Sequence, residues 1–274
     1  MAVPERREPE APRATPTSVS LPMAIPSTGW RVGMESRVDS RGLAASVQQR
    51  MSGVVRWELS RTRAGALRGR GVVDSFSVQS SLDSVAIARD ARSSIVSPLL
   101  VDLVMDSTTV RVTPRPVLSN ECDRMETLAA SLAREVLIRI PDEVTVGSVW
   151  RDSTVSFVCR DGVPMTVTTV TRSRLTDHST RRVIIERSGI LRIAGSGGTA
   201  ARGMEIEGEG TTTDRVELDP MRGTMDRLRG ERTLTLRIRP QVTSGRPRVV
   251  VANPPTHSVV VTQRVTTTVD RLRN

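Results

Sequence analysis

At 274 residues, the chain is long enough to bury roughly three quarters of the surface that its unfolded form exposes, as one large β domain or two smaller domains. All 40 of its basic residues are arginines, and a formal net charge of +10 favours acidic protein faces, phosphates or anionic lipid headgroups as partners. No stretch reaches the roughly eighteen uncharged apolar residues of a membrane-spanning helix, so we expect a soluble or peripheral chain.

The first 26 residues are expected to form an extended arm. They contain six of the sixteen prolines, mixed with Arg and Glu, and they can bury too little apolar surface to order themselves. Extended arms bind by wrapping around a partner, so Arg6, Arg7 and Arg13 are candidate partner contacts. The arm lacks the apolar h-region of a secretory signal, so the chain is either cytoplasmic or has lost a leader.

Residues 27–118 are expected to form an N-terminal β-sheet region. In VVRWELSR (54–61), Val55, Trp57 and Leu59 share one face, while charged and polar side chains share the other. This period of two is typical of half-buried antiparallel strands.

One helix is expected between the two β regions, within residues 119–141, with its regular part over 121–138. Asn120 can cap its N-terminus, and Pro141 ends it. Its apolar stripe consists of Met125, Leu128, Ala129, Leu132 and Val136.

Residues 142–274 are expected to form a C-terminal antiparallel β region. In RTLTLRIR (232–239), Leu234, Leu236 and Ile238 lie on one face and polar residues on the other. Together these patterns predict a mainly β protein: an antiparallel bent sheet or half-barrel, or two packed sheets, with one amphipathic helix.

The stretch RGMEIEGEGTTTDRVELDP (202–220) contains candidate carboxylates. We expect strands on either side of a turn at Gly208 and Gly210, with Glu205 and Glu207 on the outward face. A catalytic acid needs burial to raise its pKa, whereas arginines on the paired strand would keep these carboxylates ionised. The pattern therefore favours a solvated, Arg-paired face over catalysis.

Part of the chain resembles uncharacterised secreted bacterial β proteins, in which a "vG..W.D" strand opens a meander that ends in a "G.G…D…G" hairpin. That arrangement is similar to the half-barrel of periplasmic lipoprotein carriers, an antiparallel sheet wrapped around a helix. The resemblance covers about half the chain, and it implies a cell-envelope location and an apolar concavity. Its segments are TVGSVWRDSTVSF (145–157), GVPMTVTTVTRSRL (162–175), RRVIIERSGI (181–190), GSGG (195–198) and GEGTTTDRVELDPMRG (208–223).

Other short motifs favour turns over catalysis. The two Asp-Ser-Thr copies, at 106–108 and 152–154, lack the Gly of an aspartic protease loop and are expected to start turns at strand boundaries. TDHST (176–180) is expected to be a polar hairpin turn, because adjacent residues cannot form a triad. GSGG (195–198) lacks the spacing of a phosphate-binding loop and is expected to be an ordinary loop.

The two cysteines and two histidines do not predict a metal site. Cys122, Cys159, His178 and His257 lack the spacing of zinc ligands. Cys122 and Cys159 could form one disulfide in an oxidising compartment, or remain two buried thiols.

Arginines are dense between residues 215 and 248, but the sequence argues against nucleic acid as the partner. Single-strand binders need aromatic stacking platforms, and the chain has three Trp, two Phe and no Tyr. No helix-turn-helix or zinc finger is visible either.

The function expected from the sequence is a non-enzymatic accessory or scaffold subunit without a cofactor. It would dock on acidic protein surfaces of a membrane-associated complex of the cell envelope, for example a photosynthetic reaction-centre assembly, with anionic lipid headgroups as a further contact. The contacts would be the arm and Arg-rich strand faces, including Arg237 and Arg239. The alternative is a periplasmic carrier of a lipid or other hydrophobic ligand.

Overall fold

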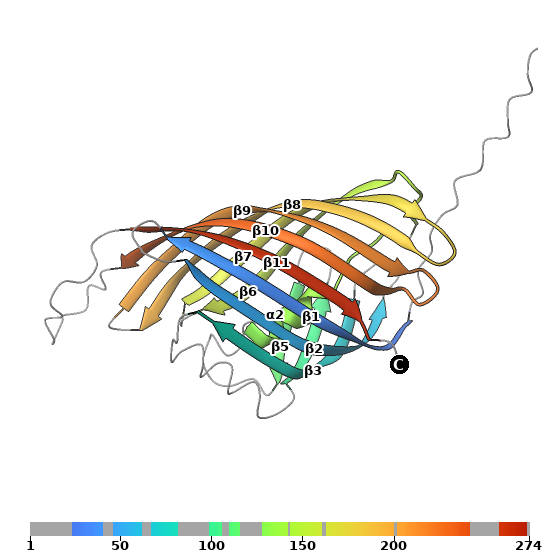
Figure 1. Cartoon of the computed structure of the whole chain (residues 1–274), viewed down its shortest axis with the longest axis horizontal. Coiled ribbons are helices and arrows are strands. Elements are labelled where there is room, and N and C mark those ends of the chain that lie inside the picture. The colour runs from blue at the N-terminus through green and yellow to red at the C-terminus, as the bar shows by residue number, and fades with distance from the viewer. Residues whose placement is uncertain are drawn as a thin grey trace, which may run out of the picture.

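The described part of the chain is built almost entirely from long strands (Figure 1). In this computed structural model it comprises residues 24–40, 46–61, 67–81, 99–105, 110–115, 128–141, 143–160, 163–199, 202–241 and 258–272. The strands are β1 (Ala24–Ser40), β2 (Val47–Arg61), β3 (Leu67–Ser80), β4 (Leu99–Met105), β5 (Val110–Arg115), β6 (Val149–Arg160), β7 (Val163–His178), β8 (Val183–Thr199), β9 (Arg202–Asp219), β10 (Thr224–Gln241) and β11 (Val259–Arg271).

All eleven strands belong to one antiparallel sheet, in the order β5-β4-β3-β2-β1-β11-β10-β9-β8-β7-β6. Two meanders, β1 to β5 and β6 to β11, are joined where β1 pairs with β11, from Trp30 opposite Arg271 to Ser40 opposite Val261. The expectation of a mainly β, antiparallel protein is therefore confirmed. Of the two arrangements considered, the described residues form one sheet and not two packed ones.

The sheet is strongly bent and nearly closed around the short helix α2 (Leu128–Glu135), which lies inside the curve in Figure 1. The two edge strands approach each other without pairing: the guanidinium of Arg111 on β5 lies 6.0 Å from the ring centre of Phe157 on β6. One sheet face is thus turned inward onto the helix and the other outward.

Helix α2 is shorter than the helix expected from the sequence. Residues 116–127, including the expected cap Asn120, lie outside the described residues. At the other end the helix stops at Glu135, where the amide of Leu137 bonds to the carbonyl of Arg134 in a tight turn. Val136, Ile138 and Ile140 then continue as buried, non-helical chain, which suits β-branched residues. No described helix is long and apolar enough to cross a membrane.

The main core lies between α2 and the inner face of β1 to β5, and it continues onto buried residues of β7 to β11 such as Leu175, Ile185 and Leu218. Trp57 is 0% exposed, and its indole N–H donates to the carbonyl of Ala133 at 3.0 Å, which ties β2 to the helix. Trp30 donates in the same way to the carbonyl of Met225 at 2.7 Å, which ties β1 to β10. The expected inward face of Val55, Trp57 and Leu59 is confirmed.

The stretch from 202 to 220 corrects one expectation: there is no turn at Gly208 and Gly210. Both lie inside β9, because leucines of β10 occupy the space over them. A Cβ at Gly208 would lie 2.4 Å from Cδ2 of Leu236, and one at Gly210 would lie 2.8 Å from Cδ2 of Leu234. GSGG (195–198) likewise belongs to strand β8 and not to a loop. Small residues here make room for a neighbouring strand.

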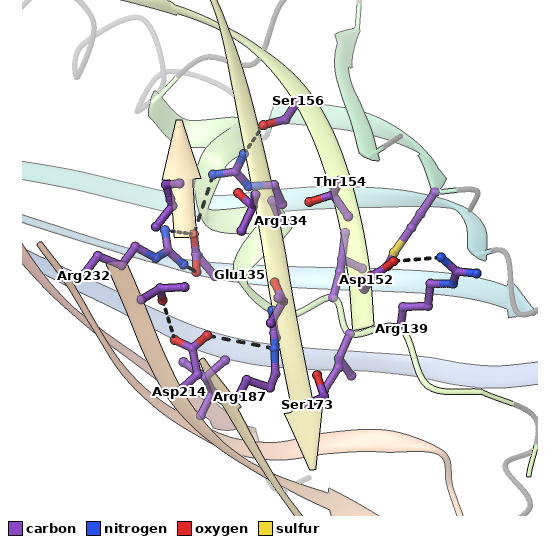
Figure 2. A pocket seen from close by; sticks show the side chains of 18 residues that line it. Arg134, Glu135, Arg139, Asp152, Thr154, Ser156, Ser173, Arg187, Asp214 and Arg232 are labelled. Carbon is purple, nitrogen blue, oxygen red and sulfur yellow. Dashed lines mark hydrogen bonds and ion pairs between the residues drawn. The ribbon is translucent and has the colours of Figure 1, made fainter. Parts of the chain in front are cut away.

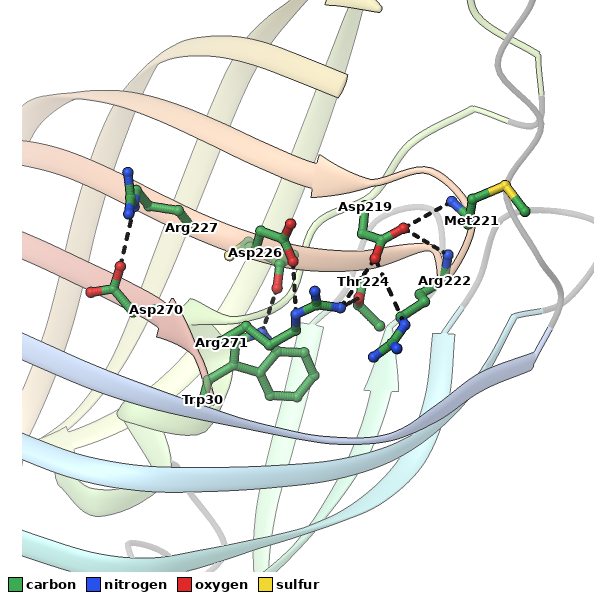
Figure 3. A network of polar contacts seen from close by, with 10 residues as sticks. Trp30, Asp219, Met221, Arg222, Thr224, Asp226, Arg227, Asp270 and Arg271 are labelled. Carbon is green, nitrogen blue, oxygen red and sulfur yellow. Dashed lines mark hydrogen bonds and ion pairs between the residues drawn. The ribbon is translucent and has the colours of Figure 1, made fainter. Parts of the chain in front are cut away.

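The true hairpin turn follows Asp219, where the sequence places Asp219-Pro220 (Figure 3). The carboxylate of Asp219 accepts the amides of Met221 at 3.0 Å and Arg222 at 3.1 Å. Gly223 closes the turn at φ 62°, and its amide donates to the carbonyl of Asp219 at 2.9 Å. Arg271 of β11 also reaches the Asp219 carboxylate, at 3.2 Å.

Replacing Gly223 by Ala is expected to lower the free energy of unfolding by about 1 kcal/mol, because a side chain is disfavoured at positive φ. Urea denaturation of the purified chain measures this change. Met221→Ala in the same turn is the control, since Met221 is 82% exposed and should change stability little. Equal effects of the two substitutions would contradict the assigned turn geometry.

Candidate functional site

Many outward arginines form ion pairs with acidic residues of neighbouring strands. Arg239, an expected partner contact, lies 3.6 Å from Glu205 and 3.4 Å from Glu207. The two glutamates therefore lie on an Arg-paired outer face, as the sequence analysis expects. Arg237 is exposed and has no ion-pair partner among the described residues. Exposed pairs of this kind stabilise a fold by at most about 1 kcal/mol.

A different set of arginines is concentrated without acidic partners, on the outer side of β6 and β7. Arg151 lies directly opposite Arg172, and Arg174 lies two residues further along β7. All three are exposed, and none makes an ion pair within the described part of the chain. The nearest acidic neighbour, Glu186, is opposite Arg174.

Glu186 does not neutralise this group, because its carboxylate pairs with Arg215 at 3.5 Å on the other side. Like charges directly opposite one another in a sheet are destabilising. Arg151, Arg172 and Arg174 therefore form a concentrated positive region, which we call the basic face.

Exposed apolar side chains adjoin the basic face. Val170 on β7 and Ile190 on β8 lie opposite each other and are 47% and 56% exposed. Val149, opposite Arg174, is 46% exposed. Apolar residues beside arginines are typical of contact surfaces between proteins.

A shallow depression continues the basic face across β8, β9 and β10. Its lining includes the outward arginines Arg172, Arg174, Arg215 and Arg229. Two outward glutamates, Glu186 and Glu231, lie among them. Arg215 and Arg229 are paired with Glu186 and Asp270, so the surplus positive charge stays at the basic face itself.

On the inner side of the same strands lies a small cavity of about 100 Å³, beside α2 (Figure 2). Glu135 is the last residue of α2. Its carboxylate accepts hydrogen bonds from both terminal nitrogens of Arg232 on β10, one of them at 3.0 Å. Arg134 lies 3.9 Å from the same carboxylate and donates to the hydroxyl of Ser156 at 2.8 Å. This ion pair fastens the end of the helix to the sheet.

A second carboxylate, Asp214 on β9, faces the same cavity. Its carboxylate lies 4.0 Å from Nε of Arg187 and accepts the hydroxyl of Thr212 at 3.4 Å. Burial raises the pKa of Asp214, and the charges of Arg187 and Arg232 offset this only in part.

Glu135 shows the opposite balance. Burial by itself would raise its pKa, but the charges of Arg232 and Arg134 together outweigh it, so the pKa of Glu135 lies below its ordinary value. The cavity therefore holds one firmly ionised carboxylate and one that takes up a proton more readily than usual.

Two sequence motifs have clear positions in the structure. Asp152-Ser153-Thr154 does not start a turn but lies within β6, where Asp152 accepts Arg139 at 2.8 Å. The other copy, at 106–108, lies outside the described residues. The polar turn expected at 176–180 is confirmed only in part: Thr176, Asp177 and His178 belong to β7, and the turn occupies residues 179–182. Arg182 donates to Asp177 at 2.8 Å across it.

The remaining expected site residues can be placed only in part. Cys159 on β6 is disulfide-bonded, whereas Cys122 lies outside the described residues. Arg6, Arg7 and Arg13 also lie outside them. Among the residues that the structure describes, no group of three or more metal-ligating side chains is suited to hold a metal ion.

The basic face and the cavity are not among the sites expected from the sequence, although β7 carries a signal for both. Its inward positions change from Val163, Met165 and Val167 to Thr169, Thr171 and Ser173. Over the same stretch, the outward positions become Val170, Arg172 and Arg174. Hydroxyls facing inward and an apolar residue facing outward indicate a polar interior and a contact surface outside.

Comparisons with known proteins leave the chain without an assigned family. No protein-family model matches it, and no curated protein is similar to it in sequence. Among solved structures, Pseudomonas aeruginosa OccK5 (OpdH) is 6% identical, with 90% of this chain and 98% of that chain covered and a TM-score of 0.24. P. aeruginosa OccK11 (OpdR) is 6% identical, with 92% and 99% covered and a TM-score of 0.25. A mutant Rh. blastica porin is 8% identical, with 90% and 100% covered and a TM-score of 0.23. Scores this low support no conclusion about this chain.

Proposed function

We propose that this chain is a non-enzymatic accessory subunit that docks on an acidic protein surface of a larger, membrane-associated complex of the cell envelope. The basic face, with its neighbouring Val170 and Ile190, is the contact surface. The observation that carries the proposal is the placement of Arg151, Arg172 and Arg174 side by side, with no ion pair to an acidic side chain among the described residues.

The charge arrangement supports an acidic partner. Arg151 and Arg172 repel each other across the β6–β7 pair, and this costs the isolated chain stability. Carboxylates of a partner would relieve the repulsion and accept bidentate hydrogen bonds from the guanidinium groups. Complementary charge of this kind also raises the rate of association and makes it sensitive to salt.

One feature favours a protein over a lipid surface as the partner. Val170 and Ile190 form an apolar area next to the arginines, which suits the centre of a protein contact. The free edge of β6 does not add to this preference, because it faces β5 where Arg111 lies over Phe157.

The carrier alternative receives no comparable support. Pockets for drug-sized ligands have volumes of about 300–1,000 Å³. The cavity beside α2 has about 100 Å³ and is lined by charged and hydroxyl side chains together with apolar ones such as Met105 and Leu191. The larger hollows, of about 600 to 760 Å³, are lined mostly by arginine, threonine and other polar residues, which do not suit a hydrophobic ligand.

The proposal is tested by rebinding to salt-washed native membranes. The triple variant Arg151→Gln/Arg172→Gln/Arg174→Gln is expected to bind about tenfold more weakly than the unmodified chain, because it loses the charges that meet the partner. Bound protein is measured by quantitative immunoblotting against concentration.

The matched control is Arg68→Gln/Arg70→Gln/Arg264→Gln, which removes the same charge from exposed positions on β3 and β11. It should rebind like the unmodified chain. If both triple variants weaken binding equally, attraction depends only on net charge and the basic face is not the docking surface.

A further inference from the structure

The cavity beside α2 contains more positive than negative charge. Three guanidinium groups, from Arg134, Arg187 and Arg232, surround it, against two carboxylates, Glu135 and Asp214. The Arg139–Asp152 pair also borders the cavity, but its charges cancel at 2.8 Å. A surplus charge away from water is costly unless a counter-charge accompanies it.

Arg187 is the guanidinium that is least satisfied. Glu135 is engaged by Arg232 through both oxygens, and Arg134 donates to Ser156. Within the described residues, the ion pair of Arg187 is with Asp214 at 4.0 Å, which is longer than a hydrogen bond, and its charge also acts on Glu135. Its side chain is about four-fifths buried and borders the cavity (Figure 2), so its remaining donors face a space that only water or a ligand can fill.

Hydroxyl groups without partners line the same space. Thr171 and Ser173 on β7 are 5% and 3% exposed, and neither side chain makes a hydrogen bond in the described part of the chain. Both border the cavity. Neither hydroxyl oxygen is among the fully buried, unsatisfied polar atoms of the described chain, so both reach the cavity and can donate to water or to an anion there.

We propose that this cavity binds one small oxyanion, a phosphate or a carboxylate group, held by Arg187 and by the hydroxyls of Thr171 and Ser173. The volume of about 100 Å³ would hold about three water molecules, which is space for a free anion but not for an acyl chain. The raised pKa of Asp214 agrees with this assignment, because a protonated Asp214 would repel the anion less. The site is internal and does not depend on the docking function.

Equilibrium dialysis of the full chain against inorganic phosphate, in a buffer without other oxyanions, tests the proposal. The unmodified chain is expected to bind one phosphate per chain, and Arg187→Gln to bind at least tenfold more weakly. Arg192→Gln is the matched control: it removes the same charge from the same strand but from an exposed, outward position, and it should bind normally. Binding by Arg187→Gln that equals the control would overturn the site.

Ser173→Ala keeps every charge, so it provides the answer if Arg187→Gln does not fold. We expect it to weaken phosphate binding several-fold while the thermal midpoint without phosphate stays close to that of the unmodified chain. Acetate should compete with phosphate if the site takes any small oxyanion. If neither phosphate nor acetate binds, or if only a long-chain lipid anion does, the cavity is not a site for a free small anion and the proposal fails.

Discussion

Trp57→Ala is expected to lower the free energy of unfolding by about 3–5 kcal/mol. Trp57 is fully buried between β2, β3 and α2, and its ring lies over Gly71, where an added Cβ would come within 2.5 Å of it. The substitution removes this packing and also leaves the carbonyl of Ala133 without the indole donor. Urea denaturation followed by fluorescence and circular dichroism measures the loss.

Two milder variants separate the hydrogen bond from the packing. Trp57→Phe keeps a ring but removes the N–H that bonds to Ala133, and should cost about 1–3 kcal/mol. Trp150→Phe is its control, because the indole N–H of Trp150 has no partner in the described structure. If the two substitutions lower the free energy of unfolding equally, the hydrogen bond from Trp57 to Ala133 does not contribute measurably to stability.

Glu135→Gln is expected to lower the free energy of unfolding by about 3–5 kcal/mol at neutral pH, because it removes the buried charge that accepts two hydrogen bonds from the Arg232 guanidinium. The pair also joins the end of α2 to β10, so its loss should loosen the helix first. Hydrogen exchange of residues 130–140 would detect that loosening before global unfolding.

The effect of Glu135→Gln should depend on pH. The pKa of Glu135 is lowered in the folded chain, so its stabilisation is present above the ordinary value of 4.5 and is lost as the pH falls through the folded pKa. The difference between Glu135→Gln and the unmodified chain should therefore shrink in acid. A difference that stays constant with pH would contradict the assigned ion pair.

Asp214 should show the opposite dependence. Because its folded pKa is raised, its contribution is most favourable below the ordinary value of 3.8 and is lost as the pH rises through the folded pKa. Asp214→Asn should therefore gain stability relative to the unmodified chain as the pH increases from acid to neutral. The contrast between two neighbouring carboxylates makes each variant the control for the other.

The period-two patterns in the sequence were sufficient to predict strands and their faces. Leu234, Leu236 and Ile238 do face inward, because the alternation directly reports which side meets the core. The glycines were misleading, because a local pattern does not show the neighbouring strand. Gly208 and Gly210 look like turn residues in the sequence, but they lie opposite Leu236 and Leu234 of β10, whose side chains occupy the space of a Cβ.

The candidate sites depend on the order of the strands in the sheet, and the alternation of apolar and polar residues does not predict that order. Arg151 and Arg172 are twenty-one positions apart, and their opposition follows from the β6–β7 register. The ion pair of Glu135 with Arg232 spans 97 positions and requires the sheet to curl around α2. The change of pattern along β7, from inward Val167 to outward Val170, was the local signal available.

The most direct test of the docking function is native mass spectrometry of the particle purified gently from the source membranes. A docking subunit should appear at fixed stoichiometry with a membrane complex and should leave it when the salt concentration is raised, because its arginines form the contact. A chain that runs alone with a bound lipid, or that stays attached at high salt, would contradict docking through the basic face.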